Sequence, residues 1–102
     1  MLMQKILIVF LLSITFISGS NGENILKDNF TNKNEWTYIA DNVMGGVSKG
    51  GVKFNSFDSD VYALLSGDVS TENNGGFIQI RRELKNIDLS RAKSIRLYAR
   101  GN

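Results

Sequence analysis

The residue types that most enzymes use for nucleophilic and acid–base chemistry are scarce in this sequence. Its 102 residues include no Cys and no His. The Ser–His and Cys–His nucleophile arrangements are therefore excluded, and zinc loses its two favoured ligands. Two of the 10 acidic residues would suffice for glycoside hydrolysis, but nothing in their spacing brings two together in a cleft. The sequence predicts no catalytic residues, no cofactor and no metal site, and it favours a protein that acts by binding.

Three aspartates come closest to a metal site. Asp58, Asp60 and Asp68 carry the oxygen ligands that calcium prefers. Their spacing is not that of an EF-hand loop, and solvated acids in turns are the favoured interpretation.

Two polar, glycine-rich segments are the main candidates for binding. Gly45–Gly46 and Gly75–Gly76 each follow a polar turn and precede an expected strand. The favoured interpretation is structural, because glycine permits positive φ or close approach of the backbone at a tight corner. The alternative is a loop pair at one end of the sheets that admits a ligand or a partner chain, since rigid scaffolds commonly carry binding residues on loops. The candidate binding residues are Trp36, Asp41, Asn42, Met44, Gly45, Gly46, Ser48, Asn73, Asn74, Gly75 and Gly76.

Trp36 and Met44 each have two interpretations. A Trp in a small β-sandwich more often fills the core, whereas an exposed Trp would offer a stacking face for a sugar. Met44 either fills a gap in the core or, if it is exposed, becomes a contact for a partner.

The segments that must position these residues have the near-two periodicity of strands. Strands are expected at residues 25–30, 36–39, 52–55, 61–65, 77–82 and 95–100, with one helical turn at 88–92. Turn residues rich in Gly, Asn, Asp and Ser separate them. The alternation predicts that Ile78, Ile80, Ile95, Leu97 and Ala99 face the core, with Arg96 and Arg100 outward. The fold class is therefore all-β, a sandwich or barrel.

The first 22 residues have the pattern of a secretory signal peptide. Lys5 is followed by an apolar run of 12 residues, Ile6 to Ile17, and then by small residues up to Gly22. The run is shorter than the roughly 20 residues that a membrane-spanning helix needs, and the segment has no Arg, unlike a mitochondrial presequence. We expect a cleavable signal helix at residues 1–22 and an exported domain at 23–102, secreted or periplasmic, with no stable membrane anchor after cleavage. An uncleaved anchor is the alternative.

Basic residues gather towards the end of the chain. Residues 81–102 hold seven Lys or Arg and two acidic residues, whereas residues 23–80 hold four Lys and eight acidic residues. Such a basic end attracts anionic partners, but the aromatic residues that would stack on nucleic-acid bases are not interleaved with it. We expect no nucleic-acid partner.

Three blocks carry a family resemblance. The first runs from Trp36 to Ser48 and includes Asp41-Asn42-Val43-Met44-Gly45-Gly46-Val47-Ser48. The second is Leu65-Ser66-Gly67 followed by Glu72-Asn73-Asn74-Gly75-Gly76-Phe77-Ile78, and the third is Asp88-Leu89-Ser90 followed by residues 95–102. Their order and spacing resemble the N-terminal portion of the complex I intermediate-associated protein 30 family. The resemblance implies a galactose-binding-like jelly-roll β-sandwich, incomplete here, and an assembly or chaperone-like module whose partner is a protein. A carbohydrate-binding module is the alternative.

We expect export to remove the leader and to leave Glu23, or a residue within two of it, at the N-terminus. The small residues Ser20 and Gly22 favour a cut before Glu23, and a cut after Ser20 is the competitor. N-terminal sequencing of the exported protein checks this, and a chain that still begins at Met1 would contradict it.

Overall fold

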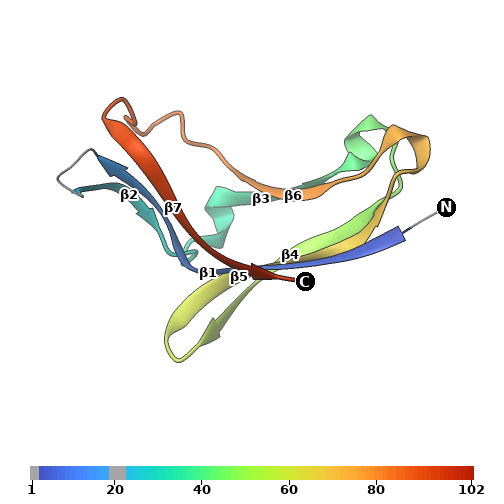
Figure 1. The fold of residues 1–102 in the computed structure, drawn as a ribbon, viewed down its shortest axis with the longest axis horizontal. Helices are drawn as coiled ribbons and strands as arrows, with labels where there is room; N and C mark the ends of the chain where they lie inside the picture. Colours follow the sequence, from blue (N-terminus) through green and yellow to red (C-terminus); the bar gives the residue numbers. More distant parts are fainter. Residues whose placement is uncertain (1–2, 19–22) are drawn as a thin grey trace.

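The computed structural model describes residues 3–18 and 23–102, which form two antiparallel sheets. The larger sheet has the strand order β2-β1-β5-β4, with β7 also paired to β1. Its strands are β1 (Met3–Ser18), β2 (Glu23–Asp28), β4 (Lys49–Phe57), β5 (Asp60–Ser70) and β7 (Ala92–Gly101). The smaller sheet pairs β3 (Trp36–Ala40) with β6 (Ile78–Arg82) and lies above the larger sheet in Figure 1. The three short 3₁₀ turns are η1 (Lys33–Glu35), η2 (Asp41–Met44) and η3 (Glu72–Asn74).

The six strands expected from the sequence are all present, and the all-β class is confirmed. The helical turn expected near Asp88 is a tight turn, closed by the N–H of Ala92 donating to the carbonyl of Leu89 at 2.9 Å. The described residues form a five-stranded and a two-stranded sheet, and the jelly-roll topology stays a prediction.

The segment expected to be a signal helix is a strand. Residues 3–18 form β1, which pairs with β2 and β5 along one edge and with β7 along the other. The expected helix is therefore not confirmed. The physical reason is that this apolar run is rich in Ile, Val, Phe and Thr, whose side chains fit a pleated sheet as readily as a helix. Cleavage of the leader stays a prediction. Among the described residues, none lies in a helix with the length and apolar character to span a membrane.

The core lies between the two sheets. It consists of the buried side chains of Ala40 and Ile78 from the smaller sheet and of Leu65 and Val69 from β5, with Tyr38 and Ile80 packed against them. The alternation of β5 turns every second residue towards this layer, as expected for a strand with one buried face. Removing such a buried Leu would cost about 2–5 kcal/mol.

The predicted inward faces are correct for one strand and wrong for another. Ile78 is buried and Ile80 half-buried, as expected. On β7, however, Ile95 and Leu97 keep 60% and 48% of their surface exposed, and Ala99 is exposed too. Among the described strands β7 pairs only with β1 (Figure 1). The end of the smaller sheet faces Ile95 only across an open pocket, which Trp36 and Arg82 also line. The alternation correctly predicted that β7 is a strand, but it could not predict which part of the chain would cover its apolar face.

Two glycines in the β4–β5 hairpin make a matched test of this packing. A Cβ on Gly67 would collide with the backbone of Lys49 and Gly50 on the paired strand, whereas a Cβ on Gly51 would meet nothing within 4 Å. We expect Gly67→Ala to lower the free energy of unfolding by about 2 kcal/mol through overpacking, and Gly51→Ala to change it by less than about 0.5 kcal/mol. Chemical denaturation of the two variants measures this. Equal effects would show that the strands can separate at no cost.

Candidate functional site

Two loops that are far apart in the sequence meet at one end of the β3–β6 ribbon. Residues 41–48 leave β3 and include η2, and residues 71–77 lead into β6 and include η3. They meet because Ala40, the last residue of β3, pairs with Ile78, the first residue of β6. The loop that follows β3 therefore lies beside the loop that precedes β6. We call residues 41–48 and 71–77 the loop pair. It is at the upper right of Figure 1.

The carboxylate of Asp41 joins the two loops. Asp41 is fully buried. Its Oδ1 accepts a hydrogen bond from the N–H of Ser48 at 3.0 Å, and its Oδ2 accepts from the Ser48 hydroxyl at 2.5 Å. Oδ2 also accepts from the N–H groups of Gly76 and Phe77 at 2.7 and 3.3 Å. The Asp41 N–H in turn donates to the carbonyl of Phe77 at 3.1 Å. A buried charge is tolerated only when it is satisfied in this way.

Ser48 extends the network from the loop pair to β5. The Ser48 hydroxyl oxygen accepts a hydrogen bond from the N–H of Ser70 at 2.9 Å. Ser70, the last residue of β5, is almost fully buried, and its own hydroxyl oxygen accepts from the N–H of Glu72 at 3.2 Å. On the exposed side, the amide of Asn73 donates to the carbonyl of Gly45 at 3.1 Å. The loop pair is thus a single hydrogen-bonded unit.

The glycine pairs serve this unit in two ways. A Cβ on Gly46 would lie 2.5 Å from the Asp41 carboxyl carbon, and a Cβ on Gly75 would lie 2.5 Å from Asp41 Oδ2. Any side chain at either position would therefore displace the carboxylate. Gly45 has a positive φ of 88° and ends η2, a conformation in which glycine is at ease. The structural interpretation of the glycine pairs is confirmed, and the loops of the alternative interpretation do lie side by side.

Hydrogen bonding sets the ionisation of Asp41. Burial alone would raise the pKa of Asp41, but the hydrogen bonds from Ser48, Gly76 and Phe77 favour its charged form and together hold the pKa below its ordinary value of 3.8. Burial, and after it the nearby negative charge of Asp41, raises the pKa of Tyr38. Asp41 is therefore a fixed anion at neutral pH. Its oxygens already accept four hydrogen bonds, so it is suited to hold the loops and not to exchange protons.

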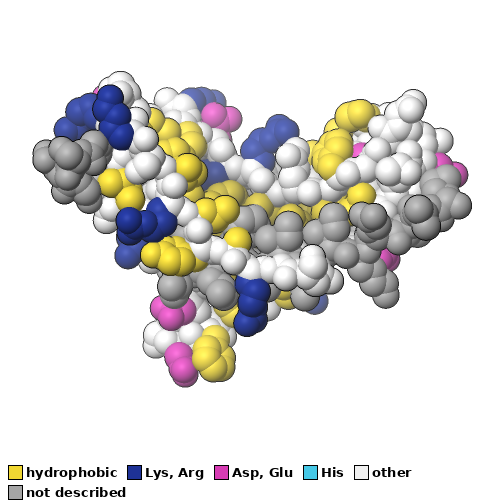
Figure 2. Space-filling view, viewed as in Figure 1, with side chains coloured by type: hydrophobic (Ala, Val, Ile, Leu, Met, Phe, Trp, Pro, Cys, Tyr) yellow, Lys and Arg dark blue, Asp and Glu magenta, His cyan; other side chains and the backbone are white. Residues whose placement is uncertain are grey.

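The tip of the loop pair is apolar and exposed. Val43 and Met44 in η2 keep 70% and 61% of their surface exposed, and Figure 2 shows hydrophobic side chains at the surface over this part of the molecule. Asn42, Asn73 and Asn74 beside them are exposed and uncharged. Met44 is therefore exposed and does not fill a gap in the core, so it stays a candidate contact for a partner. Chemically, this surface can bury apolar area and exchange amide hydrogen bonds with a partner.

All of the candidate binding residues except Trp36 lie in the loop pair. Trp36 pairs with Arg82 at the opposite end of the β3–β6 ribbon. Its ring is half-buried and tilted against Phe30 with the centroids 5.2 Å apart, and its indole N–H donates to Asp28 Oδ2 at 3.0 Å. Trp36 is therefore neither a fully buried core residue nor an exposed platform: it is half-buried and lies outside the core cluster of Ala40, Leu65, Val69 and Ile78.

A second buried carboxylate was not foreseen from the sequence. Asp28 accepts hydrogen bonds from the N–H of Phe30 at 2.8 Å, from the Trp36 indole and from the Arg82 guanidinium, with which it forms an ion pair. The other arm of the guanidinium pairs with Glu35 at 2.9 Å. No local sequence pattern predicts this cluster, because Asp28 and Arg82 are 54 residues apart. The one available signal was Arg82 itself, which alternates in phase with the inward Ile78 and Ile80.

Among the residues that the structure describes, no three acidic side chains are grouped so as to hold a metal ion. Asp58 and Asp60 lie at the tip of the β4–β5 hairpin, and Asp68 lies within β5 opposite Lys49.

Comparison with known proteins gives one family. The model of the family described as complex I intermediate-associated protein 30 matches residues 26–102, a stretch that contains the whole loop pair and the Asp28 cluster. Neither curated proteins nor solved structures gave a match.

Asp41→Asn tests the joint between the loops. The substituted amide keeps the size of the side chain but places an N–H₂ group against donors, leaving buried groups unpaired, which is costly. We expect the melting temperature to fall by roughly 10 °C and the amides of residues 42–48 and 72–77 to lose protection from hydrogen exchange. Asp58→Asn, at an exposed hairpin position, is the matched control and should change neither. If Asp41→Asn melts like the parent protein, the carboxylate does not hold the loops.

The same site predicts an acid transition. Because folding lowers the pKa of Asp41 below 3.8, this group contributes stability that is present above about pH 4 and is lost as the pH falls through the lower folded value. Thermal melts between pH 2 and 7 should show a steeper loss below about pH 4 in the parent protein than in Asp41→Asn. Parallel curves would contradict this assignment.

Proposed function

Because this chain belongs to the complex I intermediate-associated protein 30 family, we propose that it acts as an assembly or chaperone-like module. In this proposal the chain is exported, and it binds another protein through the loop pair. The observation that carries the proposal is the exposed Val43–Met44 tip, held on loops that Asp41 fixes in place. The proposed role is binding and not catalysis, in keeping with a sequence that has neither His nor Cys.

Three physical arguments support a protein as the partner. Adjacent apolar side chains at a protruding tip gain free energy when a partner removes them from water, at about 25 cal/mol per Å² of apolar surface. A loop that is already ordered loses little conformational entropy on binding, so more of that gain remains as affinity. The uncharged amides around the tip can hydrogen-bond to a partner's backbone without the desolvation cost of a charge.

The proposal includes the compartment and the finer fold. The signal pattern of residues 1–22 supports export, and an exported chain would not meet the matrix arm of complex I, so the proposed partner is a protein of the exported compartment. Two facing antiparallel sheets agree with a galactose-binding-like jelly roll, which we propose as the architecture of the domain.

The carbohydrate alternative loses its original support. It relied on Trp36 as a stacking platform, but the ring of Trp36 packs on Phe30 and its N–H is engaged by Asp28. The protein-binding proposal does not need Trp36.

Replacing the apolar tip should weaken partner binding. A photo-crosslinker at Met44 should capture a partner from the exported fraction, and one at Phe57, which is 72% exposed on the β4–β5 hairpin, should not. With the captured protein purified, we expect Val43→Asp to weaken binding at least tenfold in calorimetry, because a charge replaces apolar surface at the contact. Phe57→Asp is the matched control. Full affinity in Val43→Asp, or loss in Phe57→Asp alone, would contradict the proposal.

A further inference from the structure

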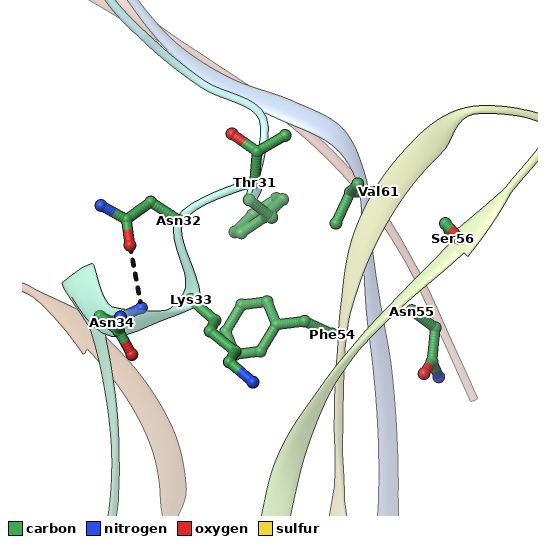
Figure 3. Close-up of a pocket in the computed structure, with 9 residues that line it drawn as sticks. Thr31, Asn32, Lys33, Asn34, Phe54, Asn55, Ser56 and Val61 are labelled. Atoms are coloured by element: carbon green, nitrogen blue, oxygen red, sulfur yellow. Dashed lines mark hydrogen bonds between the residues drawn. The ribbon is translucent and has the colours of Figure 1, made fainter.

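An opening lies away from the loop pair, between the loop after β2 and the β4–β5 hairpin. It has a volume of about 390 Å³ and is lined by nine residues, within the roughly 300–1,000 Å³ of small-molecule sites. Figure 3 shows Asn32, Lys33 and Asn34 on the loop side and Phe54, Asn55 and Ser56 on the hairpin side. The opening belongs to η1 and β4, whereas the loop pair is at the other end of the β3–β6 ribbon (Figure 1).

The loop side of this opening is ordered by its own hydrogen bonds. The N–H of Phe30 donates to Asp28 at 2.8 Å, and the Thr31 hydroxyl donates to the amide oxygen of Asn29 at 2.9 Å. The amide oxygen of Asn32 accepts from the N–H of Asn34 at 3.2 Å. A ligand would therefore meet a formed surface and would not have to order the loop.

The base of the opening is aromatic. Phe30 is buried, with 1% of its surface exposed, and its ring centroid lies 6.4 Å from that of Phe54. Phe54 is half-buried and projects from β4 toward the loop that carries Lys33 (Figure 3). Val61 completes the apolar part. A half-exposed ring beside amides offers a face for stacking and edges for hydrogen bonding.

The polar rim has one sign of charge. Its members are Thr31, Asn32, Lys33, Asn34, Asn55 and Ser56, so the rim has one cation and no anion. Lys33 is exposed, and among the described residues its ammonium has no hydrogen-bond or ion-pair partner. A rim of this composition can exchange hydrogen bonds with hydroxyl groups and attract one negative charge.

We propose that this opening binds a saccharide unit that carries a carboxylate. The C–H face of the sugar lies on Phe54, its hydroxyls exchange hydrogen bonds with Asn32, Asn34 and Asn55, and its carboxylate pairs with Lys33. The site is separate from the loop pair, so a test of saccharide binding is independent of a test of the proposed protein partner.

The test uses the full chain and two matched trisaccharides, cellotriose and the same trimer oxidised to uronate at C6. Nuclear magnetic resonance titration should give saturable shifts at residues 32–34 and 54–56, with the uronate bound more tightly. Lys33→Gln should weaken uronate binding roughly tenfold and leave cellotriose binding unchanged. Lys53→Gln, also exposed but on β4 outside the lining, is the control and should bind both sugars as the parent does.

A second pair of variants tests the aromatic base. Phe54→Leu should weaken both sugars, whereas Phe57→Leu, on the same strand but outside the lining, should weaken neither. Should Phe54→Leu fail to fold, the exposed pair Lys33 and Lys53 still decides the question. Absence of saturable shifts, shifts located elsewhere, or equal effects of Lys33→Gln and Lys53→Gln would overturn the proposal.

Discussion

The buried carboxylate of Asp41 is the constraint on which the rest of this fold depends. A charge without solvent needs hydrogen bonds on both oxygens, and Asp41 obtains them from Ser48, Gly76 and Phe77. Gly76 and Phe77 lead into the smaller sheet, whereas Ser48 precedes β4 and is bonded to the end of β5, both in the larger sheet. One side chain therefore fixes two loops to each other and the two sheets to each other.

A second carboxylate does the same at the other end of the ribbon. Asp28 ends β2 of the larger sheet, and its partners Trp36 and Arg82 belong to the smaller one. Between the two anchors lies the apolar layer of Ala40, Leu65, Val69 and Ile78. Apolar contact is not directional. The two charged anchors add directed hydrogen bonds that join the two sheets at both ends of this layer.

The sequence predicted the features that depend on residues close together along the chain, namely the strands and the turns. It did not predict the contacts between distant segments. Alternation located six strands, and the polar glycine pairs located the loops. The partnership of Asp41 with Gly76, 35 residues away, has no local signature, and neither has the Asp28–Arg82 pair. For residues 3–18 only the expected helix is not confirmed, because an apolar run fits a leader as well as a strand. Ile95 and Leu97 misled because periodicity marks an apolar face without saying what covers it.

The structure of the loop pair is the same whether the N-terminal segment is a cleaved leader or a strand of the larger sheet. Residues 3–18 can either leave with a leader or lie between β5 and β7, and the two uses exclude each other. Every hydrogen bond described for the loop pair, by contrast, is made by residues 41–77. These contacts would persist as long as the β3–β6 ribbon stays packed against β4 and β5. They include the contacts of Asp41, Ser48, Gly46 and Gly75. The site proposed to bind a partner is thus built from the part of the chain that export would leave intact.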